Sequence, residues 1–170
     1  MEQYPIHWPQ FYTATILEWK PLLGQQKYKQ VIIQSLQYFT TNKKITLYAF
    51  VIMNNHIHLI WQALPGNTPG QIQLSFMKYT TQQIKFDLVQ NHPMVLDKFR
   101  VNAKDREHQF WERNPLSIDL YTHDIFTQKL EYIHWNPVKA RLCSLPEEYY
   151  YSSARFYYTG VDDFNMLTHC

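Results

Sequence analysis

Two histidines separated by one residue form the first candidate for chemistry in this chain. His56 and His58 lie inside an apolar run that extends from Leu47 to Trp61. On a β-strand, residues i and i+2 project from the same face, so both imidazoles should point one way while Ile57 and Leu59 point into the opposite layer. Because neutral imidazole is a common metal ligand, the pair could form half of a divalent-metal site. The alternative is an ordinary half-buried pair, with one ring hydrogen-bonded and the other solvated.

A second candidate lies far along the chain, where Tyr132 and Asn136 are four residues apart. This spacing places both side chains on one face of a helix. A tyrosine is a covalent nucleophile once ionised, and an asparagine offers a carbonyl oxygen to a hard cation. Pro137 disfavours helical geometry in the residue before it, so we expect the helix to end at Asn136 or to restart at Pro137. The alternative is a packing tyrosine, one of thirteen in the chain, followed by an ordinary Asn-Pro turn.

The elements that must position these residues follow from hydrophobic periodicity and turn residues. Asn54-Asn55 predicts a turn between two strands. Residues 65–70 form a loop rich in proline and glycine, and residues 91–107 indicate an irregular connection. The pattern predicts helices over 25–41, 71–89 and 124–142, and strands over 11–19, 45–53, 56–62 and 110–111 with 116–121. This order predicts an α+β fold with one antiparallel sheet and helices packed on one face.

Composition limits the class of protein. The 170 residues, 45% hydrophobic and 16% aromatic, predict one packed domain over 1–170 with an irregular aromatic tail from about residue 146. Two cysteines do not suggest a disulfide framework, so we expect a reduced, cytoplasmic setting. Residues 1–8 lack the pattern of a signal peptide and no apolar run could span a bilayer, so we expect no membrane partner. A net charge of +2 neither demands nor excludes nucleic acid.

Taken together, the two motifs resemble those of the single-tyrosine HUH transposases. The segments that carry the resemblance, to the REP-associated tyrosine transposase-like branch in particular, are Met53–Ile60 and Tyr132–Leu142, with weaker agreement at Phe110–Arg113 and Tyr149–Arg155. The resemblance extends from about residue 11 to residue 158. It implies a ferredoxin-like HUH nuclease fold. Asn54 and Arg141 depart from the family pattern, because the family commonly has proline and glycine at these positions.

The resemblance also implies a site and a reaction. His56 and His58 match the paired metal ligands, Asn136 matches the third ligand, and Tyr132 matches the nucleophile. The implied activity is metal-dependent cleavage and strand transfer of single-stranded DNA through a 5′-phosphotyrosine intermediate, with Mg²⁺ or Mn²⁺ as the cofactor. Two imidazoles and an amide bring no negative charge, so the cation would keep its full charge for the scissile phosphate. The implied partner is single-stranded DNA with hairpin or inverted-repeat structure.

Basic and aromatic residues near the motifs are candidates for DNA contacts. Lys139, Arg141 and Arg155 could bind phosphates, although solvated surface charge is the alternative. Trp111 could stack on unpaired bases, and so could Trp135 and the tyrosines at 149–151, with core packing as the alternative.

Two other functions remain open at the level of sequence. The first is a catalytically inactive DNA-hairpin-binding module derived from the same family. The second is a small metal-binding protein unrelated to DNA, which rests on the histidine pair alone. We expect a monomer rather than a homodimer, because no long exposed apolar strand is left over after the fold is built.

Overall fold

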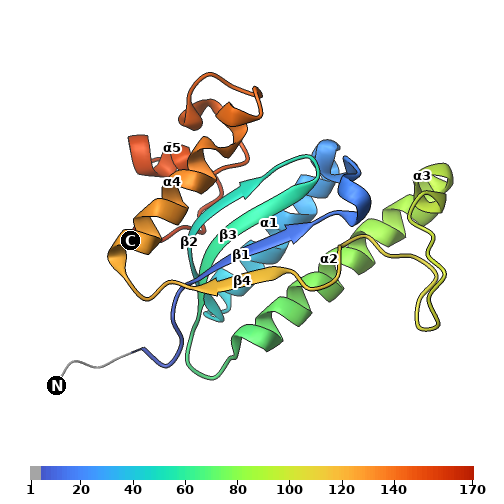
Figure 1. The fold of residues 1–170 in the computed structure, drawn as a ribbon, viewed down its shortest axis with the longest axis horizontal. Coiled ribbons are helices and arrows are strands. Elements are labelled where there is room, and N and C mark those ends of the chain that lie inside the picture. The colour runs from blue at the N-terminus through green and yellow to red at the C-terminus, as the bar shows by residue number, and fades with distance from the viewer. Residues whose placement is uncertain (1–4) are drawn as a thin grey trace.

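Four antiparallel strands form the sheet that carries the histidine pair (Figure 1). The structure is a computed structural model that describes residues 5–170. We expected no signal peptide from residues 1–8, and residues 1–4 of that segment lie outside the described residues. The strands lie in the order β2-β3-β1-β4, and all neighbouring pairs are antiparallel. Their bounds are Gln10–Thr15 for β1, Ile45–Ile52 for β2, His56–Ala63 for β3 and Leu116–Asp119 for β4.

Two long helices pack side by side on one face of this sheet (Figure 1). They are α1 (Gln26–Thr41) and α2 (Pro69–Asn91). Alternate residues of the strands, among them Tyr12, Ile57 and Leu59, point into this larger core. The N-terminus of α2 is fixed by a capping box at Thr68, which bonds the backbone of residue 71 while the Gln71 side chain bonds back. The predicted α+β fold with one antiparallel sheet is confirmed.

A third helix, α4 (His123–Lys139), packs on the opposite face of the sheet against β2 and β3. Phe126 and Ile133 of α4 join Phe11, Val51 and Ile60 in a second, smaller apolar cluster. The prediction that helices pack on one face therefore holds for α1 and α2 but not for α4. The physical reason lies in the strands, because residues 49–53 and 57–61 are buried without interruption. A strand that is apolar on both sides requires cover on both faces.

The C-terminal tail is more regular than the sequence predicted. It contains a 3-10 turn at Pro146–Glu148 and a short helix, α5 (Ala154–Thr159). The segment between them runs along the outer edge of β2, where the Ile52 N–H donates to the Tyr151 carbonyl at 2.9 Å. These backbone bonds stabilise a tail whose local sequence does not indicate a strand or a helix by itself.

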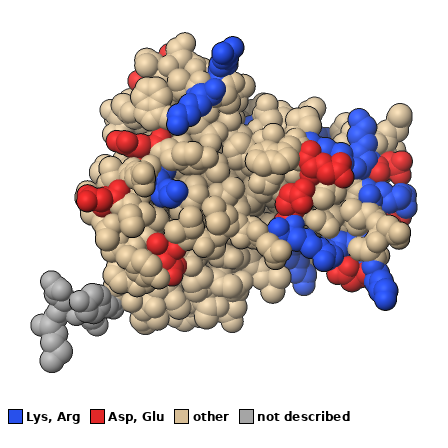
Figure 2. Space-filling view, viewed as in Figure 1, with Lys and Arg blue, Asp and Glu red and all other residues tan. Residues whose placement is uncertain are grey.

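A short helix, α3 (Pro93–Asp97), interrupts the connection between α2 and β4 that was predicted to be irregular. Proline at a first helical position is favourable because its missing N–H would have no partner there. Figure 2 shows charged side chains of both signs gathered around α3 and the chain that follows it, whereas the sheet side of this view is mostly uncharged. Within residues 5–170, no helix combines the length and apolar character needed to cross a membrane.

Candidate active site

The pairing of β1 with β3 places the two histidines on one face of the sheet, as predicted. Thr13 lies opposite His58, and Thr15 lies opposite His56. Residues directly opposite each other in an antiparallel pair project from the same face. The centroids of the two imidazole rings are 4.8 Å apart. Both rings lie on the side of the sheet that α4 covers, away from the larger core.

Hydrogen bonds orient both rings in the same manner. The Asn55 Oδ1 atom accepts from His56 Nδ1 at 2.7 Å, so the other nitrogen of that neutral ring, Nε2, carries a free lone pair. The Thr13 hydroxyl lies 2.7 Å from His58 Nδ1, and His58 Nε2 is buried without a hydrogen-bond partner. Metal-binding histidines are typically held in this way, with one nitrogen hydrogen-bonded and the other open. The two rings differ in burial, because His58 is 5% exposed whereas His56 is half-buried and lines a hollow.

The surroundings keep both imidazoles neutral. Burial lowers the pKa of His58 to about 3, and the electrostatic effects of His56 and Lys129 contribute to this lowering. Burial also lowers the pKa of His56, although the nearby Asn136 side chain opposes this effect. Neutral imidazole is the form that binds a metal ion. Asn136 of α4 lines the same hollow as the two histidines of β3.

Helix α4 supplies the other half of the site. Tyr132 and Asn136 face one hollow of about 490 Å³ together with the histidine pair. We call this the active-site hollow, and the residues that matter most in it are Thr13, His56, His58, Lys129, Tyr132 and Asn136. The Tyr132 ring lies 5.2 Å from the His58 ring, and the residue is 43% exposed. Residues of two distant motifs therefore meet at one place.

The expected break of α4 at Asn136 does not occur, because the helix continues through Pro137 to Lys139. The proline lies in the last turn of the helix, where its missing N–H removes only one helical bond. The Ala140 N–H still donates to the Asn136 carbonyl at 3.0 Å, so the helix closes beyond the proline. Tyr132 and Asn136 consequently share a helical face, as their spacing predicted.

Two lysines flank the Tyr132 ring. The Nζ atoms of Lys129 and Lys139 each lie 5.8 Å from its centroid, and Lys129 also lies 4.9 Å from the centroid of Phe11. Sequence reasoning missed Lys129, although its position three residues before Tyr132 places it on the same helical face. Thr13 was also missed, because only the register of β1 against β3 reveals it. Among the described residues that line the hollow, none carries a carboxylate.

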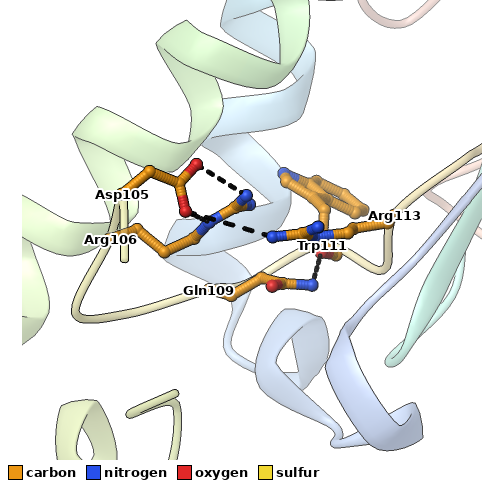
Figure 3. Close-up of polar contacts among 5 residues, drawn as sticks. All are labelled: Asp105, Arg106, Gln109, Trp111 and Arg113. Atoms are coloured by element: carbon orange, nitrogen blue, oxygen red, sulfur yellow. Dashed lines mark hydrogen bonds and ion pairs between the residues drawn. The ribbon is translucent and has the colours of Figure 1, made fainter. Parts of the chain in front are cut away.

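Trp111 does not contact DNA in the manner that the sequence suggested. It is only 5% exposed, and its indole Nε1 donates to the Thr80 hydroxyl at 3.1 Å. The Gln109 amide donates to the Trp111 carbonyl at 2.9 Å (Figure 3). This burial contradicts the prediction that Trp111 stacks on bases, because little of the indole is accessible to a base. Figure 3 also shows an ion-paired cluster beside it, formed by Asp105, Arg106 and Arg113.

The three predicted phosphate contacts differ in their positions. Lys139 lies beside Tyr132, but Arg141 and Arg155 do not line the active-site hollow. Arg141 follows the end of α4 with a φ of 60°, the left-handed conformation that glycine adopts most easily at this position of a helix. Arg155 on α5 pairs with Asp163, with 3.6 Å between Nη1 and Oδ2. The roles of all three in DNA binding stay predictions.

The fold of this chain is similar to the folds of two solved structures, one of a tyrosine transposase and one of a protein provisionally named a transposase. The REP-associated tyrosine transposase bound to a REP hairpin superposes with a TM-score of 0.64 at 16% identity, over 99% of this chain and 90% of that one. A protein of Deinococcus radiodurans R1, provisionally named a transposase, superposes with a TM-score of 0.50 at 12% identity, over 78% of this chain and 95% of that one. No family model matches the sequence, and no curated protein matches it. The structural similarity confirms the fold that the resemblance implied.

Proposed function

We propose that this chain cleaves and rejoins single-stranded DNA through Tyr132. The observation that carries the proposal is the meeting of two oriented imidazoles with Tyr132 and Asn136 in one hollow. The fold shared with the tyrosine transposases supports the same activity. The reaction is a phosphoryl transfer, in which positioning and charge account for most of the catalysis.

The proposed reaction conserves the phosphodiester. The Tyr132 phenolic oxygen attacks the scissile phosphorus, and a new P–O bond forms while the bond to the 3′ oxygen breaks. The phenolic proton leaves through solvent, and the departing 3′ oxygen takes up a proton. The products are a 5′-phosphotyrosine and a free 3′-hydroxyl. Attack by a 3′-hydroxyl reverses these steps and rejoins the strand without ATP. The exposure of Tyr132 gives a DNA strand access to the nucleophile.

The lysines beside the tyrosine act on the phosphate in this proposal. Lys129 and Lys139 place positive charge on both sides of the Tyr132 ring. Charge of this kind attracts the DNA backbone independently of its sequence. The packing of the Lys129 ammonium over Phe11 restricts where this charge can lie. The two lysines therefore hold the backbone against the nucleophile.

The residues of the hollow fit a divalent cation. His56 and His58 offer the Nε2 atoms left open by their hydrogen bonds, and Asn136 offers an amide oxygen. No group of three or more His, Cys, Asp or Glu side chains within residues 5–170 is arranged for a metal, so this set would contain only one amide besides the imidazoles. When bound there, Mg²⁺ or Mn²⁺ would polarise a phosphoryl oxygen. The lack of a carboxylate among the described lining residues suits a ligand whose own phosphate brings the negative charge.

The proposed substrate is single-stranded DNA that carries a hairpin. The solved REP-associated tyrosine transposase is bound to a REP hairpin, and we extend this partner to the present chain. Inverted repeats in the DNA that flanks the coding region are the natural source of candidate hairpins. The Lys129 and Lys139 side chains lie where the strand beside such a hairpin would reach the tyrosine.

The test is the formation of a covalent adduct. The protein is incubated with labelled hairpin oligonucleotides and Mn²⁺, and the products are separated on a denaturing gel. We expect an adduct with the wild type and with Tyr158→Phe, at an exposed tyrosine outside the hollow, but not with Tyr132→Phe. Hairpin binding without an adduct under any metal would instead establish a hairpin-binding module. Failure to bind DNA would overturn both functions, and cleavage by His56→Ala would overturn the metal ligands.

A further inference from the structure

Trp19 is an exposed aromatic residue that lines the active-site hollow. It is 61% exposed, although indole is among the largest apolar groups. Its ring meets the His56 ring edge-on, with 5.8 Å between centroids. An aromatic face is thus left open to solvent next to the groups proposed to hold the scissile phosphate.

The backbone that presents Trp19 is strained. Glu18 and Trp19 have φ angles of 54° and 57°, so two consecutive residues with side chains adopt the left-handed conformation. This conformation is uncommon outside glycine, and consecutive examples are rarer still. Such strain persists only when the surrounding structure enforces it, and it concentrates at functional sites.

Hydrogen bonds from other elements enforce this conformation. The Glu18 N–H donates to the Glu112 carboxylate at 2.6 Å, and the Leu17 N–H donates to the Phe110 carbonyl at 2.8 Å. The Asn55 amide lies 3.5 Å from the Trp19 carbonyl, and the same side chain accepts from His56 Nδ1. The turn is therefore fixed both to the chain before β4 and to a proposed metal ligand. These bonds hold the Trp19 side chain in a fixed position beside His56.

We propose that Trp19 is a stacking platform for an unpaired base of the nucleotide next to the scissile phosphate. This inference rests on the proposed function. An unpaired base has a π-face that an indole can cover, and stacking of this kind tolerates any base. Lys129 of the hollow and Lys139 beside Tyr132 would bind the backbone while Trp19 binds the base, so the strand would be fixed at two chemically different points.

The first experiment observes Trp19 directly. The protein contains five tryptophans, and labelling with 5-fluorotryptophan gives each of them a fluorine NMR signal. The Trp19→Phe variant identifies the Trp19 signal by its loss. The protein is titrated with oligothymidylate of about 20 nucleotides, longer than typical single-strand site sizes of about 4–16. We expect the Trp19 signal to move, whereas that of Trp61, which is only 3% exposed and packs in the larger core, stays in place.

The second experiment measures affinity by fluorescence anisotropy with the same oligonucleotide. We expect Trp19→Leu to bind about 10-fold more weakly, equivalent to about 1.4 kcal/mol, and Trp19→Phe to keep most of the affinity. Tyr158→Leu, at an exposed aromatic residue of α5 that does not line the hollow, is the control and should bind like the wild type. An abasic strand of equal length keeps the phosphates but has no bases. Wild type and Trp19→Leu should bind this strand equally.

The outcomes separate the platform from the proposed function. If the wild type binds oligothymidylate while the Trp19 signal stays in place, the platform does not exist. If Trp19→Leu and the wild type bind the base-bearing strand with equal affinity, the platform likewise does not exist. In both cases the adduct test at Tyr132 is unaffected. If the wild type binds hairpin DNA but not oligothymidylate, the platform fails alone. If it binds neither, the platform and the proposed function fail together.

Discussion

The unpartnered Nε2 of His58 predicts that the active-site hollow lowers the stability of the protein when no ligand is bound. His58 is 5% exposed, and this nitrogen is buried without a hydrogen bond. An unsatisfied buried polar atom costs about 1–3 kcal/mol, whereas replacing both partners of a hydrogen bond by apolar groups is close to neutral or stabilising. We therefore expect Thr13→Val with His58→Leu to raise the free energy of unfolding by about 1–3 kcal/mol at neutral pH. In a domain of this size, each kcal/mol corresponds to about 2–4 °C in Tm.

The same substitution should change the dependence of stability on pH. Burial lowers the pKa of His58 from 6.5 to about 3 in the folded protein. As the pH falls below 6.5, the unfolded chain binds a proton that the folded protein does not bind until about pH 3. The wild type therefore keeps its full stability above pH 6.5 and loses it progressively below. At about pH 5 the loss is about 2 kcal/mol, from about 1.4 kcal/mol per pKa unit.

The assay is urea denaturation of both proteins in EDTA, followed by far-UV circular dichroism at pH 7.5 and 5.0. The advantage of the double variant should widen by about 2 kcal/mol between these two conditions. His134, whose pKa is lowered to about 4 by burial, is present in both proteins, so its effect cancels in the difference. Thr13→Val alone is the control and should be destabilised, because it leaves His58 Nδ1 without its partner. A double variant less stable than wild type at pH 7.5, or a difference that does not change with pH, would refute the reasoning.

Three further predictions concern single positions. Lys129→Gln should slow adduct formation about 10-fold or more, because it removes a half-buried positive charge beside Tyr132. An unchanged single-turnover rate would contradict this role. Mn²⁺ at about 100 times its Kd should stabilise the wild type by about 2.7 kcal/mol but not His56→Ala, as measured by thermal unfolding; equal shifts would refute the ligand set. Trp111→Phe removes the hydrogen bond to Thr80 and should lower the free energy of unfolding by about 1 kcal/mol. The folded variant should bind DNA like the wild type, and weaker binding would show that Trp111 does contact DNA.

The long elements were predictable because their periodicity is local. The helix expected over 25–41 is observed at Gln26–Thr41, and the strand expected over 56–62 is observed at His56–Ala63. The common face of the two histidines followed from the period of a strand, and that of Tyr132 and Asn136 followed from the period of a helix. These periodicities correctly placed each pair of residues on a shared face, and the two faces meet at one hollow.

The parts that depend on distant contacts were not predictable in the same way. The strand expected over 11–19 ends at Thr15. Glu18 and Trp19 adopt the left-handed conformation, and the sequence does not indicate this because neither residue is a glycine. Thr13 lies beside His58 only through the register of two strands that are far apart in the sequence. Aromatic character alone did not reveal that Trp111 is buried and Trp19 is exposed. Burial depends on the tertiary fold, whereas periodicity depends on neighbours in the chain.

The division of the apolar residues into two clusters has a consequence for mutational tolerance. The larger cluster, behind the sheet, contains most of the buried side chains and holds α1 and α2 in place. The smaller one sets the position of α4 over β3 through Phe126 and Ile133. Substitutions in the larger cluster should mainly affect yield and folding, whereas conservative ones in the smaller cluster should move the nucleophile relative to the histidines. Random mutagenesis should thus find variants with an altered rate of adduct formation mainly on the side of the sheet that α4 covers. Selection could change this rate there without destabilising the larger cluster.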